Sequence, residues 1–444
     1  MSMKENLLNL RTKLKLDSHH ATERFGVIFA AFAVGLALLT TGAISTSVAN
    51  GIQKTSETAL YTPSFTTSKT GLSGSVAGVY VSKDRTRSLV LMQFANTASS
   101  AISADANNYQ SFLTASDLNQ AKQSLNSKIS GQFVVFGTTG YLGVVLDSAT
   151  PFSQQILNLT VRANSQLVYK ADDSVNLRAD LKNDKSFREY DQWRVYVNPG
   201  ASQATVTDAI PGAGSSFSPA AAYYDLVVKP KEEDARKSLD DSLAKMKVDL
   251  AKITEYTTQM ATTQVGNVSI VPPAVPVQIA GDKITGGPGT GKDGKPDAPL
   301  ALQSKWTAPT GYSFDWRSGT VQKGYLDQLV PKGESYVSYL SKKAAAGKAA
   351  NGSENTTPSF STSALQWKLS DGTDLAKDYR DTNGVMKPLL DLMNNLSQAY
   401  QTYYDDKIAY QTKGYNSLIS LEVDLKNVDS SSTTNTKDNA VLTY

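Results

Sequence analysis

The segment KEEDARKSLDDSLAKMKVDLAKITEYTTQMA, residues 231–261, decides the fold of this chain. Its seam positions recur at alternating intervals of four and three residues, which is the repeat of a helix that packs along another helix. The segment also carries six Lys or Arg and seven Asp or Glu, so its outer face is solvated and mixed in sign. We therefore predict a coiled-coil helix over residues 231–262, with a seam formed by Leu239, Leu243, Met246, Leu250, Ile253 and Met260.

A second heptad pattern lies near the C-terminus, in residues 386–428. It begins with a proline suited to a first helical turn, slips over residues 406–414, and then resumes. Two such helices, separated by residues 263–385, favour an antiparallel pair with a domain inserted between them. The alternative is that each helix packs on another copy of the chain, which would give an oligomer. The seam residues of the second helix are Leu389, Leu392, Leu396 and Tyr403.

Residues 72–230 contain eight short runs that are rich in β-branched and aromatic residues, the last of them at 224–228. Apolar residues alternate within the runs at 156–161 and 193–197, which is typical of half-buried strands. One amphipathic helix is expected at 116–130. The sequence therefore predicts an α+β protein with a β-sandwich-like domain that precedes the long helices.

The insertion at 263–385 begins with a linker, because 13 of the residues at 263–300 are Gly or Pro. Four aromatic residues follow, and they have two interpretations. They form either the core of a small domain, which we favour, or a platform on which a sugar ring stacks. These residues are Trp306, Tyr312, Trp316 and Trp367. The chain is predicted to end in a polar, disordered tail at 429–444.

An uncharged stretch at residues 25–48 is long enough to cross a membrane as a helix. Five Lys or Arg precede it, so the positive-inside rule places residues 1–24 in the cytoplasm and the bulk of the chain outside the cell. A cleaved signal peptide is the alternative, since small residues at 47–49 suit a signal peptidase. We favour a retained signal-anchor because the uncharged stretch is longer than a typical signal peptide core. Residues 49–71, rich in Ser and Thr, are predicted to form a stalk.

The composition excludes several classes of site. The chain has no Cys and only two His, His19 and His20, and both precede the predicted membrane segment. The rest of the chain therefore cannot use thiolate or imidazole chemistry, either in catalysis or in metal binding. A net charge of +3 does not indicate a nucleic-acid-binding protein. We assign no catalytic, cofactor-binding or metal-binding residue.

Two short motifs are similar to catalytic ones but lack their context. The segment GGPGTGKD, residues 286–293, has the spacing of a phosphate-binding loop, yet Asp293 replaces the magnesium-binding hydroxyl and no helix can follow. Ser242 and Lys245 have the S-x-x-K spacing of a serine nucleophile and its lysine, but they lie on the heptad helix. We interpret the first motif as linker and the second as helix surface.

From these features we expect a single-pass, membrane-anchored structural protein of a bacterial cell envelope, and not an enzyme. It would belong to a surface appendage, a secretion system or a conjugation-type machine, and would self-associate or bind protein partners through its coiled-coil helices and β domain. The alternative is an extracellular glycan-binding protein or a carboxylate-dependent hydrolase. The aromatic residues would then form the ligand platform, and an acidic pair, Glu189 with Asp191 or Asp371 with Asp374, would supply the chemistry.

Overall fold

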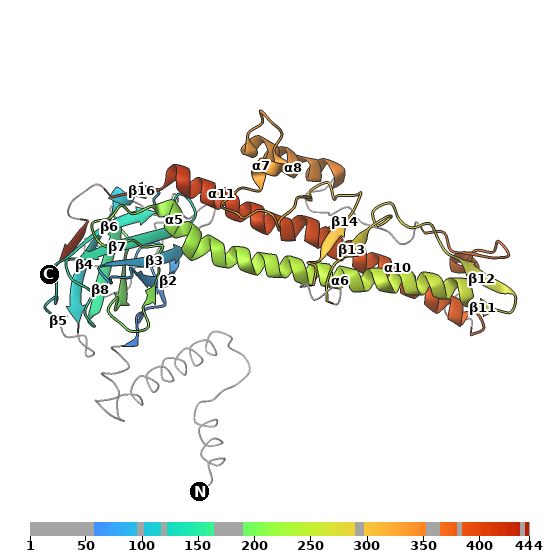
Figure 1. Ribbon diagram of the computed structural model, residues 1–444, viewed down its shortest axis with the longest axis horizontal. Coiled ribbons are helices and arrows are strands. Elements are labelled where there is room, and N and C mark those ends of the chain that lie inside the picture. Colours follow the sequence, from blue (N-terminus) through green and yellow to red (C-terminus); the bar gives the residue numbers. More distant parts are fainter. Residues whose placement is uncertain are drawn as a thin grey trace, which may run out of the picture.

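A computed structural model describes residues 57–95, 102–116, 122–163, 190–288, 297–351, 365–379, 384–435 and 440–443. The chain is a mixed α+β protein, as predicted, with mainly antiparallel sheets at one end and two long helical stretches that extend from them (Figure 1). Among the described helices, none combines the length and the apolar character that a membrane crossing requires. The predicted anchor at 25–48 lies outside the described residues.

Two sheets make up the β part. The larger sheet contains, in spatial order, β1 (Ser64–Thr66), β2 (Ser73–Val81), β3 (Arg87–Phe94), β7 (Tyr141–Ser148), β6 (Ile129–Val135) and β16 (Thr433–Thr434), with β10 (Thr205–Val206) beside β2. The smaller sheet contains β17 (Val441–Thr443), β4 (Tyr109–Ser116), β8 (Ile156–Ala163) and β9 (Gln192–Val197), with β5 (Lys122–Gln123) beside β4. A short 3-10 helix, η1 (Ala106–Asn108), precedes β4.

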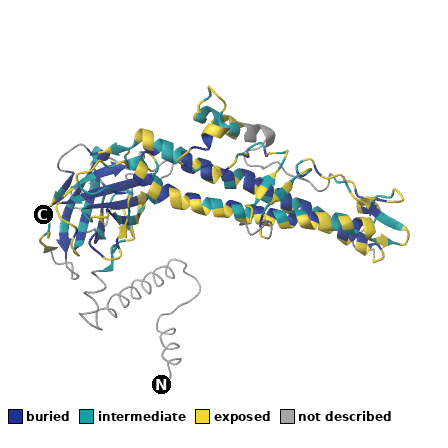
Figure 2. Cartoon of the chain, viewed as in Figure 1, coloured by how far each residue is buried: buried dark blue, intermediate teal, exposed yellow. Residues whose placement is uncertain are grey.

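The two sheets share one apolar core, which receives side chains from both of them. The predicted alternation is confirmed in β8 and β9, where every second residue is buried. Trp193 from β9 lies at the centre of an aromatic group, stacked on Phe65 at 5.8 Å and edge-on to Phe94 at 5.3 Å between ring centroids. Figure 2 shows this core as buried strands within the β part.

Two local predictions within this region are wrong. Residues 224–228 are not a strand but a π-helix, η2 (Tyr224–Val228), which joins α5 (Pro219–Tyr223) to α6 (Lys229–Thr262). The helix begins earlier because Ser218 caps it and Pro219 occupies its first turn, and the burial of Val228 then outweighs the strand preference of the β-branched residues. Within 116–130 the described residues form β5 and the start of β6 rather than a helix.

The helical pair consists of α6 and a return path made of α10 (Lys387–Ala409), the π-helix η4 (Tyr410–Gly414) and α11 (Tyr415–Ser431). The two paths run side by side in opposite directions (Figure 1). The predicted slip at 406–414 contains η4, whose wider turn changes the face that the following residues present. The predicted seam residues are buried in one cluster shared by both paths, except Leu250, which is partly buried at its edge.

The insertion is not a separate domain, because its buried residues belong to the same cluster as the helical seam. It contains small strand groups and short helices that lie along the helical pair (Figure 1). The strands are β11 (Gln264–Val265), β12 (Val268–Val271) and β15 (Lys368–Leu369), and separately β13 (Lys283–Thr285) and β14 (Ala301–Gln303). The helices are α7 (Leu326–Leu329), α8 (Tyr336–Asn351) and α9 (Leu375–Asp378).

The predicted stalk at 49–71 and the predicted disordered tail at 429–444 are wrong where the structure describes them. From the first, β1 pairs with β2 and Leu60 bridges to Val197. From the second, α11 continues to Ser431, β16 pairs with β6, and β17 pairs with β4. Both segments are polar in composition, but open sheet edges supply backbone partners that do not depend on apolar side chains.

The buried seam predicts the effect of a cavity there. Leu243→Ala removes a fully buried side chain of α6, so we expect a loss of about 2–5 kcal/mol in the free energy of unfolding. Val248→Ala, on the exposed face of the same helix, should change it by less than about 0.5 kcal/mol. Urea denaturation followed by circular dichroism measures both. Equal losses would contradict the packing described here.

Candidate functional site

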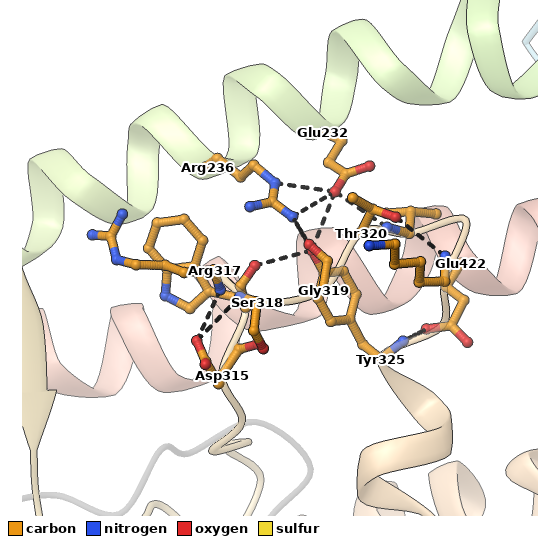
Figure 3. A network of polar contacts seen from close by, with 12 residues as sticks. Glu232, Arg236, Asp315, Arg317, Ser318, Gly319, Thr320, Tyr325 and Glu422 are labelled. Carbon is orange, nitrogen blue, oxygen red and sulfur yellow. Dashed lines mark hydrogen bonds and ion pairs between the residues drawn. The ribbon is translucent and has the colours of Figure 1, made fainter. Parts of the chain in front are cut away.

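A network of polar side chains, in which Glu232 and Glu422 are buried, joins residues 300–329, which we call the strap segment, to both paths of the helical pair (Figure 3). Glu232, Arg236 and Asp240 contribute from α6, and Glu422 contributes from α11. The strap segment contributes backbone groups and several side chains. We call this set of contacts the polar network.

Glu232 is the acceptor at the centre of the polar network, and its side chain is almost completely buried. Its Oε1 accepts hydrogen bonds from the Val321 amide at 3.1 Å and from the Tyr325 hydroxyl at 3.1 Å. Arg236, one helical turn later, donates to the same oxygen from Nε at 3.0 Å and from Nη2 at 2.8 Å. A buried carboxylate is stable here because an opposite charge and neutral donors together replace its hydration.

Arg236 connects α6 to the strap segment directly. Its Nη2 donates to the Gly319 carbonyl at 2.5 Å and to the Tyr325 hydroxyl, and its guanidinium lies 5.7 Å from the centre of the Trp316 ring. Tyr325 is fully buried, and burial raises the pKa of its hydroxyl above the ordinary tyrosine value. The hydroxyl therefore stays protonated and can donate to Glu232 while it accepts from Arg236.

Glu422 holds the other side of the strap segment, from α11. Its Oε2 accepts from the backbone amides of Tyr325 at 2.6 Å and Leu326 at 2.9 Å, where α7 begins. Its Oε1 lies 3.5 Å from the Lys426 ammonium, an ion-pair contact that is too long for a good hydrogen bond. Tyr325 is thus held by Glu232 through its side chain and by Glu422 through its backbone.

The π-helix η4 provides a third attachment, through Gln411. The Gln411 carbonyl accepts from the Tyr312 amide at 2.8 Å, outside the helix. Its side chain accepts from the Ala308 amide at 2.9 Å and donates to the Trp306 carbonyl at 3.1 Å. A wide helical turn disturbs the regular hydrogen-bond ladder, which frees backbone groups for such contacts. One buried glutamine therefore aligns three residues of the strap segment.

Arg317 closes the strap segment over α6. Its guanidinium forms an ion pair with Asp240, donates to the Leu300 carbonyl at 2.8 Å, and lies 4.1 Å from the centre of the Trp316 ring. Asp315 accepts from the Arg317 amide at 3.0 Å and so shapes the turn before it. The Ser318 hydroxyl, and to a lesser degree the backbone amides of Arg317 and Ser318, lower the pKa of the Asp315 carboxyl.

The predicted aromatic platform is not one surface. Tyr312 and Trp316 are buried in the strap segment, and Trp316 donates to the Tyr410 hydroxyl at 3.0 Å. Trp306 is half-buried against the Tyr404 ring at 6.0 Å. Trp367 is buried beside β15, outside the strap segment. These residues contribute to the apolar core, the interpretation that we favoured, and three of the four have little surface left for a ligand.

The acidic pairs of the hydrolase alternative have structural partners. Asp191 is buried and accepts from the amides of Lys69 and Thr70, both at 2.8 Å. Asp374 caps α9, and Asp371 accepts from the Thr373 amide at 3.0 Å in the turn before it. Glu189 lies outside the described residues.

The two catalytic-like motifs are explained in the same way. The Ser242 hydroxyl donates to the Ser238 carbonyl one turn earlier in α6, at 2.8 Å. The phosphate-loop-like segment at 286–293 lies mostly outside the described residues. At its start, the Gly286 carbonyl accepts from the Lys247 ammonium at 2.7 Å.

Two grooves border the strap segment. The larger, of about 560 Å³, separates α8 from the helical pair and is lined by Leu340, Lys343, Ile419 and Val423 among others. The smaller, of about 350 Å³, lies between α5, α11 and the strap segment. In the part of the chain that the structure describes, no three His, Cys, Asp or Glu side chains converge as metal ligands. The arrangement of the polar network is suited to holding the strap segment in place, because Glu232, Arg236 and Arg317 all make contacts within the chain.

Sequence reasoning identified the apolar seam but not the polar network. Glu232 and Arg236 are spaced as an ordinary surface ion pair on a helix, and Glu422 lies beside apolar seam positions. Only the slip at 406–414 could have directed attention to Gln411, because an interrupted heptad pattern indicates an irregular turn.

Comparisons of this chain with protein-family models, with curated proteins and with solved structures find no match.

The polar network predicts a contrast between two neighbouring glutamates of α6. Glu232→Gln removes the buried charge that accepts from Arg236, Tyr325 and Val321, so we expect a loss of about 1–3 kcal/mol in stability. Hydrogen exchange of the Val321 amide should become faster in that variant. Glu233→Gln, the same change at an exposed position, should alter neither quantity. Unchanged exchange at Val321 in Glu232→Gln would contradict the role of this carboxylate.

A second prediction concerns pH and the contact between α6 and α10. Burial raises the pKa of the Asp406 carboxyl, and the neighbouring carboxyl of Asp249 raises it further, against the opposing effect of Lys245. The folded state therefore binds a proton at Asp406 more tightly than the unfolded state does, and this stabilising contribution is lost as the pH rises through the raised pKa.

Asp406→Asn should consequently stabilise the protein at pH 7, and the gain should disappear below the ordinary aspartate pKa of about 3.9. Urea denaturation at a series of pH values measures it. Asp241→Asn, at an exposed position of α6, is the control and should show no such pH dependence. If Asp406→Asn increased the free energy of unfolding equally at all pH values, ionisation of Asp406 would not be the cause of the increase.

Proposed function

We propose that this chain is a membrane-anchored, exported spacer or scaffold protein of a bacterial cell envelope. In this proposal the predicted helix at 25–48 is the anchor, residues 1–24 stay in the cytoplasm, and the β part and helical pair lie outside the cell. The helical pair works as an antiparallel coiled coil that holds binding surfaces away from the sheets.

The observation that carries the proposal is the double connection between the helical pair and the β part. Helix α6 leaves the β part after α5, and α11 returns to it and is followed by β16 and β17, which pair with β6 and β4. Arg87 strengthens the departure point, because it forms an ion pair with Asp147 at 2.6 Å and donates to the Ser215 carbonyl at 2.8 Å. A projection whose two paths are both joined to the β part transmits force and position better than one on a single linker.

The polar network supports the same role. It binds the strap segment to both paths of the helical pair, so that the two paths cannot slide past each other without breaking buried hydrogen bonds to Glu232 and Glu422. Buried polar contacts of this kind add directional specificity to an apolar seam, which by itself tolerates shifts of register.

Partners in this proposal, including further copies of the chain, bind the outer faces and the far end of the helical pair, since the seam is buried within the chain. Exposed valines lie on and after β12 and just before α10. They are Val271, Val275, Val277 and Val385, of which Val277 and Val385 are 74% and 71% exposed.

The absence of cysteine from the sequence allows a direct test of the topology. Single substitutions Val277→Cys and Ser2→Cys are made in the full chain, which is then produced in a Gram-positive host. A membrane-impermeant maleimide should label Val277→Cys in intact cells, and should label Ser2→Cys only after the cells are permeabilised. The opposite pattern, or a secreted product that lacks residue 2, would contradict a retained anchor.

A further inference from the structure

A lysine and an aspartate are enclosed together between α10 and the segment before β13. The side chains of Lys407 and Asp282 are 0% and 1% exposed, and the Lys407 Nζ lies 2.6 Å from the Asp282 Oδ2. Asp282 belongs to a turn in which its own amide donates to the Ile279 carbonyl at 3.0 Å, and Ile279 is itself buried. The two side chains come from parts of the chain that are far apart in sequence.

Three further groups surround this pair. The Gln278 carbonyl accepts from the Lys407 Nζ at 2.5 Å, and the Trp306 ring centre lies 5.2 Å from the same nitrogen. The Tyr403 hydroxyl, one helical turn before Lys407, donates to the Asp282 Oδ2 at 2.7 Å. The carboxyl group thus has a hydroxyl donor on the same oxygen that faces the amine.

Full enclosure makes the neutral form of this pair accessible. Removing an ammonium and a carboxylate from water costs several kcal/mol per ion, whereas an amine and a carboxylic acid carry no such penalty. Burial lowers the pKa of the Lys407 ammonium, against the opposing effect of the Asp282 carboxylate. Transfer of one proton within the pair then gives an unprotonated amine, a nucleophile, in contact with a carboxylic acid.

We propose that Lys407 and Asp282 condense to form an isopeptide bond within the chain. The lone pair of Nζ attacks Cγ of the protonated Asp282 carboxyl, so that the Nζ–Cγ bond forms. One Cγ–O bond then breaks, and its oxygen leaves as water with the acid proton and one proton from the nitrogen. The balance is one amide formed and one water released, and the step needs no oxidant, reductant or other reactant.

The surrounding groups have defined roles in this step. Tyr403 is a catalytic residue in the strict sense, because its hydroxyl contacts the reacting carboxyl and stabilises the charge that develops on oxygen. The Gln278 carbonyl orients the amine by accepting one of its N–H groups. Fixed proximity replaces a bimolecular encounter, and the apolar surroundings exclude the water that would reverse the reaction.

The other lysine–carboxylate pairs in the described ranges do not share this environment. Lys387 and Asp391 are 2.8 Å apart on α10, but their side chains are 62% and 52% exposed, so both stay hydrated and charged. Lys343 is partly buried and donates to the Gly311 carbonyl at 2.7 Å instead of to a carboxylate. The proposal is independent of the cellular role suggested above, since it concerns only the chemistry inside the chain.

The test is mass spectrometry of the full chain, purified in detergent from whole cells and, if it is released, from the medium. The intact mass should be lower than the sequence mass by one water. Trypsin should yield a branched peptide that joins the peptide ending at Lys283 to one that spans Lys407 without cleavage. An intact mass equal to the sequence mass would overturn the proposal. So would a loss of water accompanied by normal cleavage after Lys407, because that pattern indicates cyclisation of an aspartate elsewhere.

Three variants, each compared with its own sequence mass, complete the experiment. Lys407→Arg keeps a positive charge but is not nucleophilic, so it should show the full sequence mass and no branched peptide. Lys387→Arg, the matched control on the same helix, should still lose one water. Tyr403→Phe should accumulate uncondensed chain, and condensation as complete as in the unsubstituted chain would remove Tyr403 from the mechanism. If Lys407→Arg fails to fold, the branched peptide of the unsubstituted chain decides the question alone.

Discussion

The apolar seam between α6 and the returning path is the constraint on which the other parts of this protein depend. It brings Glu232 on one path and Glu422 on the other within reach of a single residue, Tyr325, and so creates the place where the strap segment is held. The π-helix η4 packs closely against α6 in the same interface, because a Cβ atom at Gly414 would lie 2.6 Å from the Leu239 side chain. The apolar contact sets the spacing of the two paths, and the polar contacts then fix their register.

The sequence is most informative where the pattern repeats. The heptads of both helices and the alternation in β8 and β9 are predictable because each pattern repeats over several positions. In α6, for example, Leu239, Leu243 and Met246 all indicate the same buried face. A contact that depends on one residue, or on backbone groups alone, has no repeating pattern and cannot be predicted in this way. Nothing in the composition of residues 57–71 or 429–444 marks them as parts of sheets, since their pairing rests on backbone groups that every residue carries.

The polar network shows why buried polar residues are hard to predict from sequence patterns. Glu232 and Arg236 have the spacing of any solvated pair on a helix, and only the strap segment that covers Glu232 makes that carboxylate buried. The aromatic residues of the strap segment present the reverse case, because an aromatic residue such as Trp316 can belong to a core, which we favour from the sequence, or to a binding surface. In both cases the burial of the residue depends on which other segment packs against it, and this is a property of the tertiary fold.

The two short strands at the C-terminus determine when the protein can finish folding. Until β16 and β17 are in place, β6 and β4 each present an unpaired edge, although both of those strands were made hundreds of residues earlier. Contacts of such large sequence separation slow the overall folding rate. Because the residues made last complete sheets whose first strands were made early, the β part cannot acquire its full set of strand pairs until the whole chain has been synthesised.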